Sequence, residues 1–250
     1  MAKGCQGNPA GVCLLPAETN DEYYRQTAVK LGASETAFIF KKDGRFHLRW
    51  FTGRGAEVDL CGHATLASAY ILWGKGFVNS KETINFQTKS GLLAARKEGA
   101  LIVLDFPRDD VTPVAAPADF KKILGVVPLF IGKTRFDYFL TVDSEATVKN
   151  INPDLAKLKK LSARGCIVTA KSSNHEYDFV SRFFAPAVGI NEDPVTGSAH
   201  CALGPYWGNI LKKKNLVGHQ ASNEGGVVCV EVLKDRVLLK GKAKLVAHVE

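Results

Sequence analysis

Three segments of the chain combine residue types that could transfer a proton or hold an anion. In the first, residues 34–38 (SETAF), Glu35 stands where an apolar strand is expected to begin. A carboxylate in such a place loses solvation, so its pKa should rise towards the range useful for acid–base catalysis. The alternative is an exposed loop glutamate. Glu35 is therefore a candidate acid–base group. Whether its side chain is buried decides between this role and that of an exposed loop glutamate.

The second segment, residues 61–64 (CGHA), offers a thiol and an imidazole at the expected start of a helix. The helix dipole would lower the pKa of a thiol at that place. Side chains two residues apart rarely touch, which disfavours a nucleophilic pair of Cys61 and His63. A buried, hydrogen-bonded His63 that holds substrate is the other interpretation.

The third segment, residues 192–200 (EDPVTGSAH), combines two acids, two hydroxyls and a histidine. Asp193 precedes a proline, so its backbone is expected to be extended or in a turn. One interpretation is a polar site around Asp193. The alternative is a capping segment in which Thr196 and Ser198 satisfy the first N–H groups of a helix.

Apolar periodicity, capping residues and glycine stops predict the elements that would position these segments. A helix over residues 20–31 should be capped by Asn20 and ended by Gly32. Residues 107–117, rich in Pro and Ala, form the candidate linker. The predicted helices cover residues 20–31, 64–73, 152–161 and 198–211, and the predicted strands cover residues 36–40, 46–51, 83–88, 92–97, 101–106, 136–142, 166–170, 177–184, 227–233, 236–240 and 245–249.

The two halves of the chain resemble each other. Residues 48–51 (LRWF), Glu57 and residues 61–64 (CGHA) correspond to residues 181–184 (SRFF), Glu192 and residues 196–199 (TGSA). From Glu57 onwards the offset is a constant 135 residues. A duplicated half would open each helix with an x-Gly-x-Ala turn, where unpaired N–H groups and the helix dipole favour an anion. The alternative is that Gly62 and Gly197 only allow close helix packing.

Length and composition exclude several classes of protein. The chain has 250 residues, of which 46% are hydrophobic and 23% are charged, and its formal net charge is +8. These values are typical of an ordinary globular protein rather than a disordered or collagen-like one. No apolar run reaches the ~18 residues of a membrane span, and residues 1–4 begin no apolar signal segment. The basic residues are scattered, so we expect no nucleic-acid partner and no membrane partner.

Cysteine spacing and motif searches indicate no metal site and no nucleotide-binding motif. The six cysteines include no C-x-x-C pair and are expected to be reduced thiols in a cytoplasmic protein. No H-x-x-x-H, P-loop or G-x-S-x-G motif occurs. Residues 53–58 (GRGAEV) begin like a dinucleotide fingerprint but lack its third glycine.

Taken together, four segments resemble the signature blocks of the PhzF family, the phenazine-biosynthesis-like isomerases. The blocks are residues 7–12 (GNPAGV), 34–38 (SETAF), 60–67 (LCGHATLA) and 192–200 (EDPVTGSAH), in the family's order. The resemblance implies an α+β protein of the diaminopimelate-epimerase-like fold. Two similar domains would each wrap a mixed, barrel-like sheet around a central helix, with the active site between them. The implied domains are residues 1–105, with about 241–250 as a returning strand, and residues 106–240.

The same resemblance implies an activity. The family's prototype isomerises a dihydro-hydroxyanthranilate by moving a proton between carbons, without a metal or cofactor. Glu35 matches the acid–base group that carries the proton, and His63 and Asp193 match polar partners that bind substrate and tune the transfer. The implied ligand is a small anionic metabolite, and the implied assembly is a homodimer.

Four further residues match positions around the substrate in this family. Gly62 and Ser198 match the positions whose backbone or hydroxyl holds the substrate's carboxylate. Their neighbours Cys61 and Gly197 are assigned to substrate binding with them. These assignments follow from the resemblance of the motifs.

Two departures from the family pattern leave other functions open. The related epimerases use one cysteine in each half, but here Thr196 stands at the second position, which disfavours a two-base racemase that uses Cys61. Only six residues precede Gly7, where the family usually has a strand of about a dozen residues, and an open sheet edge is therefore expected. A non-catalytic binding protein that keeps the fold is the third possibility.

Overall fold

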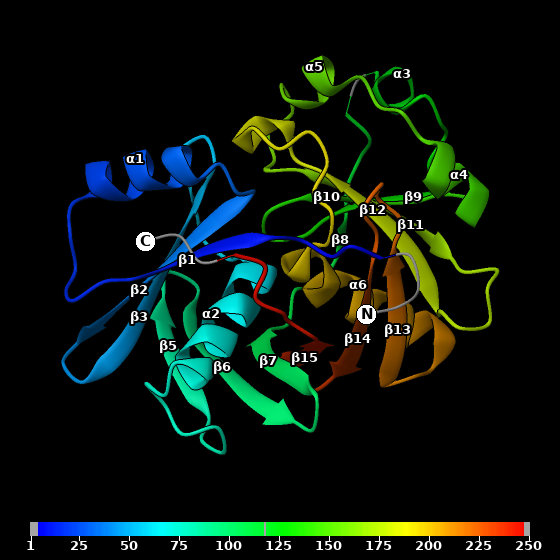
Figure 1. The fold of residues 1–250 in the computed structure, drawn as a ribbon. Coiled ribbons are helices and arrows are strands. Elements are labelled where there is room, and N and C mark those ends of the chain that lie inside the picture. Colours follow the sequence, from blue (N-terminus) through cyan, green and yellow to red (C-terminus); the bar gives the residue numbers. More distant parts are fainter. Residues whose placement is uncertain (1–4, 118, 248–250) are drawn as a thin grey trace. The chain divides into compact units, whose positions relative to one another are not determined.

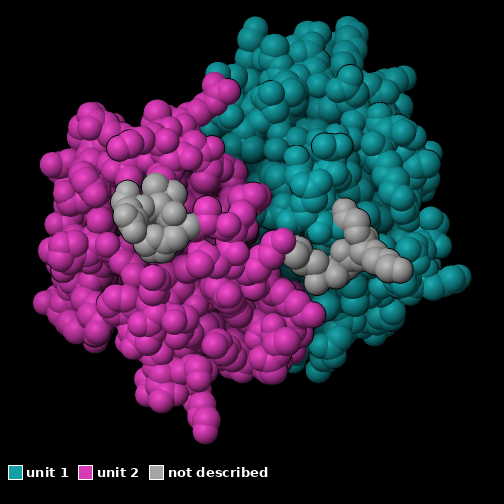
Figure 2. All heavy atoms as spheres, viewed as in Figure 1, with its two compact units in different colours: residues 1–8, 108–237 teal, residues 9–107, 238–250 magenta. Residues whose placement is uncertain are grey.

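The computed structural model describes residues 5–117 and 119–247 and divides into two compact units (Figure 2). Unit 1 comprises residues 1–8 and 108–237, and unit 2 comprises residues 9–107 and 238–250. Each unit has its own run of parallel and antiparallel strands and its own buried helix (Figure 1). None of the helices within the described ranges combines the length and the apolar character needed to cross a bilayer.

Unit 2 contains a mixed sheet with strand order β1-β2-β3-β5-β6-β7, and β4 adds to it beside β3. β1 runs parallel to β2 and β3 runs parallel to β5, whereas the other neighbours in this order are antiparallel. Among the described residues, β1 has β2 as its one strand neighbour. The elements are β1 (Ala10–Leu14), α1 (Asp21–Leu31), β2 (Glu35–Lys42), β3 (Arg45–Thr52), β4 (Glu57–Val58), α2 (Gly62–Gly74), β5 (Ile84–Thr88), β6 (Gly91–Glu98) and β7 (Leu101–Pro107).

Local signals in the sequence account for α1. The Oδ1 atom of Asn20 accepts a hydrogen bond from the Tyr23 N–H at 2.9 Å, which satisfies one of the free donors at the helix start. Gly32 ends the helix with a φ of 65°, a conformation that costs glycine little. Both predicted end residues of this helix are confirmed.

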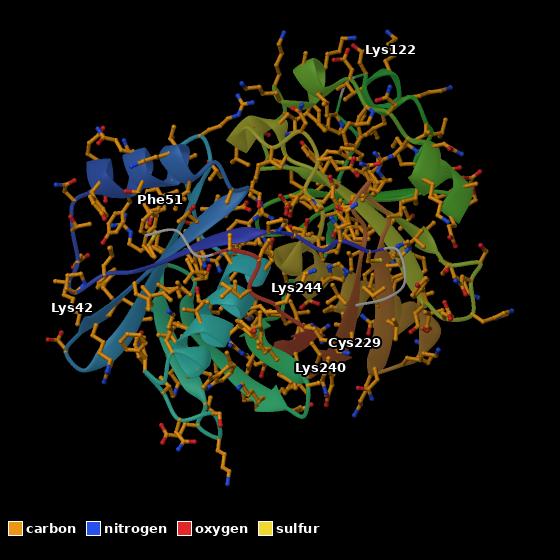
Figure 3. All side chains as sticks on the ribbon, in the orientation of Figure 1. Lys42, Phe51, Lys122, Cys229, Lys240 and Lys244 are labelled. Carbon is orange, nitrogen blue, oxygen red and sulfur yellow. The ribbon has the colours of Figure 1, made fainter. Side chains whose placement is uncertain are left out.

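The strand β2 has two buried faces that serve different parts of the core. Phe38 and Phe40 point to one face, where they pack with Phe51 beneath Tyr24 of α1 (Figure 3 labels Phe51). Side chains alternate along a strand, so Glu35 at the first position of β2 belongs to the opposite face. The helix α2 packs against β1, β2 and β7. The pleat of β2 therefore turns Glu35 away from α1.

Small residues allow α2 to be buried along most of its length. Ala64 and Ala69 are fully buried, and so are the hydroxyl residues Thr65 and Ser68. The Thr65 hydroxyl donates to the Cys61 carbonyl at 2.5 Å, and the Ser68 hydroxyl donates to the Ala64 carbonyl at 2.7 Å. These bonds to the preceding turn satisfy both hydroxyls inside the core.

Unit 1 contains strands in the order β14-β13-β12-β11-β10-β9-β8, again with both parallel and antiparallel neighbours. β10 runs parallel to β11 and β12 runs parallel to β13. The helix α6 supplies Ala199, Leu203 and Trp207 to a core with Phe179 and Phe183. The elements are β8 (Thr112–Pro113), α3 (Phe120–Leu124), β9 (Phe130–Lys133), β10 (Tyr138–Thr141), α4 (Glu145–Asn150), α5 (Leu155–Leu158), β11 (Cys166–Lys171), β12 (Phe179–Phe184), a 3-10 turn (Pro186–Val188), α6 (Gly197–Leu211), β13 (Asn215–Gln220), β14 (Gly226–Val232) and β15 (Arg236–Gly241), which ends in unit 2.

The sequence prediction was wrong in several places outside the motifs. The helix expected over residues 152–161 is shorter and forms only α5, which Asp154 caps, and the preceding helix α4, which Ser144 caps, was not predicted. The strands β9 and β13 were not predicted. The strand expected at residues 245–249 is absent at residues 245–247, and its last two residues lie outside the described part of the chain.

Candidate functional site

Glu35 is buried at the start of β2, with 6% of its surface exposed. The expectation of an exposed loop glutamate is therefore wrong. Its backbone pairs with Ala10 of β1 on one side and with Thr52 of β3 on the other. The backbone that carries the Glu35 carboxylate is therefore held between two strands.

His63, at the second position of α2, lies against Glu35. Its Nε2 atom is 3.2 Å from Oε2 of Glu35 and 3.3 Å from Oγ of Ser34. The Ser34 hydroxyl donates its proton to the Pro9 carbonyl at 3.1 Å, so its oxygen is left to accept from His63. A proton on Nε2 would face both the Glu35 carboxylate and the Ser34 hydroxyl.

Cys61 touches the other nitrogen of the same ring. Its Sγ atom lies 3.5 Å from Nδ1 of His63. The expectation that these two side chains would not meet is wrong, because Cys61 is the residue before the helix and has extended dihedral angles, φ −139° and ψ 112°. The chain bends between Cys61 and His63, and this bend turns the thiol towards the ring.

Burial and charge act in opposite directions on these groups. Burial raises the pKa of the Cys61 thiol, and it outweighs the opposing effect of His63. Burial alone would lower the pKa of His63, but the Cys61 sulfur and the Glu35 carboxylate outweigh it and raise that pKa well above its usual value. The raised pKa favours the protonated form of His63 beside the Glu35 carboxylate.

The start of α2 provides donors beside this network. No side chain caps the helix start, and no acidic residue occupies its first turn, within the described residues. The first intrahelical bond runs from Thr65 N to the Cys61 carbonyl at 3.3 Å, so the N–H groups of residues 62–64 precede it. These N–H groups and the helix dipole favour an anion next to Gly62.

Asp193 is the centre of a second polar cluster, which belongs to unit 1. It is 4% exposed, and both carboxylate oxygens have partners. Oδ1 accepts from Nδ2 of Asn8 at 2.6 Å, and Oδ2 accepts from the Thr196 hydroxyl at 2.5 Å. Gln220 closes the cluster, because its Nε2 donates to the Asp193 carbonyl at 2.6 Å and its Oε1 accepts from Thr196 N at 2.8 Å.

The two hydroxyl residues of this segment do not cap α6. Its start has no side-chain cap among the described residues. The Thr196 hydroxyl donates to Asp193 instead, and the Ser198 hydroxyl accepts from Nη2 of Arg164 at 2.9 Å. Arg164 is also paired with Asp137, which is 2% exposed. The capping interpretation is therefore wrong, and the N–H groups at the α6 start keep their capacity to bind an anion.

The structure thus brings the predicted residues together in two groups. Glu35, Cys61, Gly62 and His63 form one group within unit 2. The second group lies within unit 1 and contains Asp193, Gly197 and Ser198. The roles assigned to both groups stay predictions.

Four polar residues of these clusters were missed by the sequence analysis. Asn8 and Ser34 stand inside two of the recognised blocks, so the blocks themselves could have indicated them. Arg164 and Gln220 gave no local signal, because they lie 34 residues from Ser198 and 24 residues from Thr196. The pairing of β12 with β13 brings Gln220 to its place.

One cluster of the described residues also has the composition of a metal site. The ligand atoms of Glu35, Cys61 and His63 all lie within 4.8 Å of one another, and these residue types suit Zn²⁺. However, Nδ1 of His63 faces Cys61 while Nε2 faces Glu35. The contacts therefore form a hydrogen-bonded chain through the ring, and one ion would need a different orientation of His63.

Comparison with known proteins gives the chain its family. The model of the phenazine biosynthesis-like protein family (PhzC-PhzF) matches residues 2–249. An uncharacterised isomerase of Halalkalibacterium halodurans is 48% identical over 246 residues, which cover 98% of this chain and 92% of that protein. The crystal structure of a PhzF-family protein from Enterococcus faecalis has a TM-score of 0.86 and 40% identity, covering 96% of this chain and 91% of that one.

More distant structures share the fold alone. A probable proline racemase from Agrobacterium radiobacter has a TM-score of 0.66 at 10% identity and covers 95% of this chain and 86% of that one. The predicted fold class, α+β of the diaminopimelate-epimerase-like type, is confirmed by these neighbours. With the family model matching nearly every residue, the chain belongs to the PhzF family of phenazine biosynthesis-like proteins.

Proposed function

We propose that this protein is a cofactor-independent isomerase that moves a proton within a small carboxylate-bearing substrate. One observation carries the proposal: the buried Glu35 carboxylate lies 3.2 Å from Nε2 of His63. Membership of the PhzF family supports it, and the relative from Halalkalibacterium halodurans is named an isomerase. A small anionic metabolite as ligand and a cytoplasmic homodimer belong to the same proposal.

The proposed reaction uses Glu35 twice. Its carboxylate first takes a proton from a carbon of the substrate, and the electron pair of that C–H bond forms a new double bond. The Glu35 carboxylic acid then returns the proton to a second carbon, whose former double bond supplies the electron pair. The reaction needs no outside oxidant or reductant, because atoms and electrons balance within the substrate.

The surrounding groups are proposed to support this transfer. His63, whose Nε2 lies 3.2 Å from Glu35, is proposed to donate to it and so to steady the carboxylate between the two proton transfers. The uncapped N–H groups at the start of α2, around Gly62, are proposed to bind the substrate's carboxylate. The family resemblance assigns Asp193, Gly197 and Ser198 to the same substrate.

Solvent deuterium exchange tests the role of Glu35. Small unsaturated carboxylic acids are incubated in D₂O with the protein, and deuterium incorporation is followed by mass spectrometry. We expect incorporation with the wild type and a loss of about 100-fold or more with Glu35→Gln. Glu18→Gln is the matched control, because Glu18 pairs with Lys42 at the surface. A Glu35→Gln protein that exchanges as fast as the wild type would show that Glu35 is not the base.

A two-base racemase is the second candidate, and the 3.5 Å contact between Cys61 and His63 favours it. Two observations weigh against it. Burial raises the pKa of Cys61, and Thr196, at the position of the second cysteine, donates its hydroxyl to Asp193. A racemase predicts that Cys61→Ser abolishes turnover, whereas the Glu35 isomerase predicts that most activity remains.

A further inference from the structure

We propose that Arg49 and Arg182 are positioning residues. Each arginine holds one glutamate and thereby fixes the segment that leads to a helix of its own unit, α2 in unit 2 and α6 in unit 1. Arg49 holds Glu57 in unit 2, and Arg182 holds Glu192 in unit 1. The clamped segments continue into Cys61, Gly62 and His63, or into Asp193 and Ser198. The proposal rests on the proposed function of these residues, and it extends that function to four groups outside the site.

The two ion pairs occupy matching places in the internal repeat. Each arginine stands in a strand, β3 or β12, and its glutamate follows in the next segment. Each glutamate stands five residues before the glycine that opens the helix, since Glu57 precedes Gly62 and Glu192 precedes Gly197. The distance in sequence from the clamped glutamate to the helix start is therefore the same in both halves of the chain.

The two pairs also have matching geometry. In unit 2, Nε of Arg49 donates to Oε1 of Glu57 at 2.7 Å, and Nη2 donates to Oε2 at 3.0 Å. In unit 1, Nε of Arg182 donates to Oε1 of Glu192 at 2.6 Å, and Nη2 donates to Oε2 at 2.7 Å. The same two nitrogens meet the same two oxygens, so each glutamate is fixed in direction as well as in distance.

Each guanidinium lies over an aromatic ring that stands two positions further along the strand. The guanidinium carbon of Arg49 lies 5.2 Å from the centre of the Phe51 ring, and that of Arg182 lies 4.8 Å from the centre of the Phe184 ring. Tyr24 of α1 adds a second ring to Arg49 at 4.7 Å. The rings limit the movement of the planar groups and exclude water from one side.

Burial distinguishes these pairs from ordinary surface ion pairs. Exposed side-chain fractions are 18% and 15% for Arg49 and Glu57, and 15% and 23% for Arg182 and Glu192. Partly buried two-point pairs are screened less and held more rigidly than exposed lysine–carboxylate contacts. Arg182 also donates to the carbonyl of Ile151 at 2.7 Å, which ties it to the chain after α4.

Only short stretches of chain separate the two glutamates from the site residues. In unit 2, β4 pairs with β3 at Glu57, and three residues separate Val58 from the helix start at Gly62. In unit 1, Glu192 is the residue before Asp193, whose own N–H donates to the Phe183 carbonyl at 3.0 Å. Loss of either pair would free a short segment that carries site residues, and small misplacements of such residues slow a reaction strongly.

Hydrogen exchange by mass spectrometry tests the clamp without any substrate. We expect Glu57→Gln to increase amide exchange in residues 57–63, and Glu192→Gln to increase it in residues 192–198. Glu145→Gln is the matched control, because Glu145 is also partly buried and accepts from Ser172 and Ser173 in another loop. Arg49→Lys and Arg182→Lys keep the charge but lose the two-point geometry, so they should show the same local increase in amide exchange. They replace a Gln variant that fails to fold.

Proton exchange into small unsaturated carboxylic acids separates positioning from general stability. We expect Glu57→Gln to lower kcat about tenfold with KM within about twofold, and to cause no further loss when combined with Glu35→Gln. Glu145→Gln should leave kcat unchanged. The proposal would be overturned if Glu57→Gln and Glu192→Gln left amide exchange unchanged in their segments. It would also be overturned if the loss of kcat in the double variant Glu35→Gln/Glu57→Gln equalled the full sum of the two single losses in free energy. A wild type without proton exchange would refute the proposed function, while the amide exchange would still decide whether the clamps exist.

Discussion

Nε2 of His63 lies 3.2 Å from Oε2 of Glu35, and the two side chains are only 11% and 8% exposed. One comes from the start of a helix and the other from the start of a strand, 28 residues apart in sequence. This contact places an imidazole against a buried carboxylate, a combination that suits reversible proton uptake.

Replacing His63 tests whether its Nε2 donor is needed. His63→Ala removes the donor to Glu35, and we expect proton exchange to fall about 100-fold. His63→Gln keeps an amide donor near the position of Nε2, so it should retain more activity than His63→Ala. The rate of deuterium incorporation in D₂O measures both variants. Equal rates for the two variants would contradict a donor role of His63.

Asp193 should couple to Glu35 if both act on one substrate. Asp193→Asn places an amide donor where the carboxylate now accepts from Asn8 and Thr196, so we expect a loss of about 1–3 kcal/mol in the free energy of unfolding. Urea titration measures this loss. In activity, the double variant with Glu35→Gln should be no slower than Glu35→Gln alone. Additive losses would assign Asp193 to a purely structural role.

We expect the protein to lose stability in mild acid because of the buried His200. The residue is fully buried, burial lowers its pKa to about 4, and its Nε2 has no hydrogen-bond partner in the residues that the structure describes. Between the unfolded pKa of about 6.5 and the folded value, the unfolded chain binds more protons, so stability falls as pH falls. We expect a loss of about 2 kcal/mol between pH 7 and pH 5 from this group. Urea titrations at both pH values should show that loss in the wild type and a smaller one in His200→Gln.

Gly226 should tolerate no side chain, because of its contact with the segment that carries Asp193. A Cβ atom at Gly226 would lie 2.2 Å from Cγ2 of Val195, so Val195 or the strand would have to move. We expect Gly226→Ala to cost about 1–3 kcal/mol of stability and to lower activity. Gly74→Ala, at the end of α2, is the control, because nothing lies within 4 Å of its added Cβ. Thermal unfolding of both variants measures the difference, and equal melting temperatures would contradict the packing argument.

The sequence by itself determined the elements with strong local signals and the residues of the motifs. Asn20 and Gly32 mark the ends of α1, because capping and left-handed glycine are properties of single positions. The internal repeat located both site helices, since a glycine in an x-Gly-x-Ala turn opens each of them. The same motifs indicated the family, which the comparisons confirmed.

Only the tertiary structure decided which polar groups meet. The bend before α2 brings the Cys61 thiol to His63, and the pleat of β2 selects the face on which Glu35 is buried. Arg164 and Gln220 reach the start of α6 from distant positions, through a loop and through the pairing of β13. Such contacts depend on strand register and on the direction of the chain between elements, and no local pattern of residue types encodes either of them.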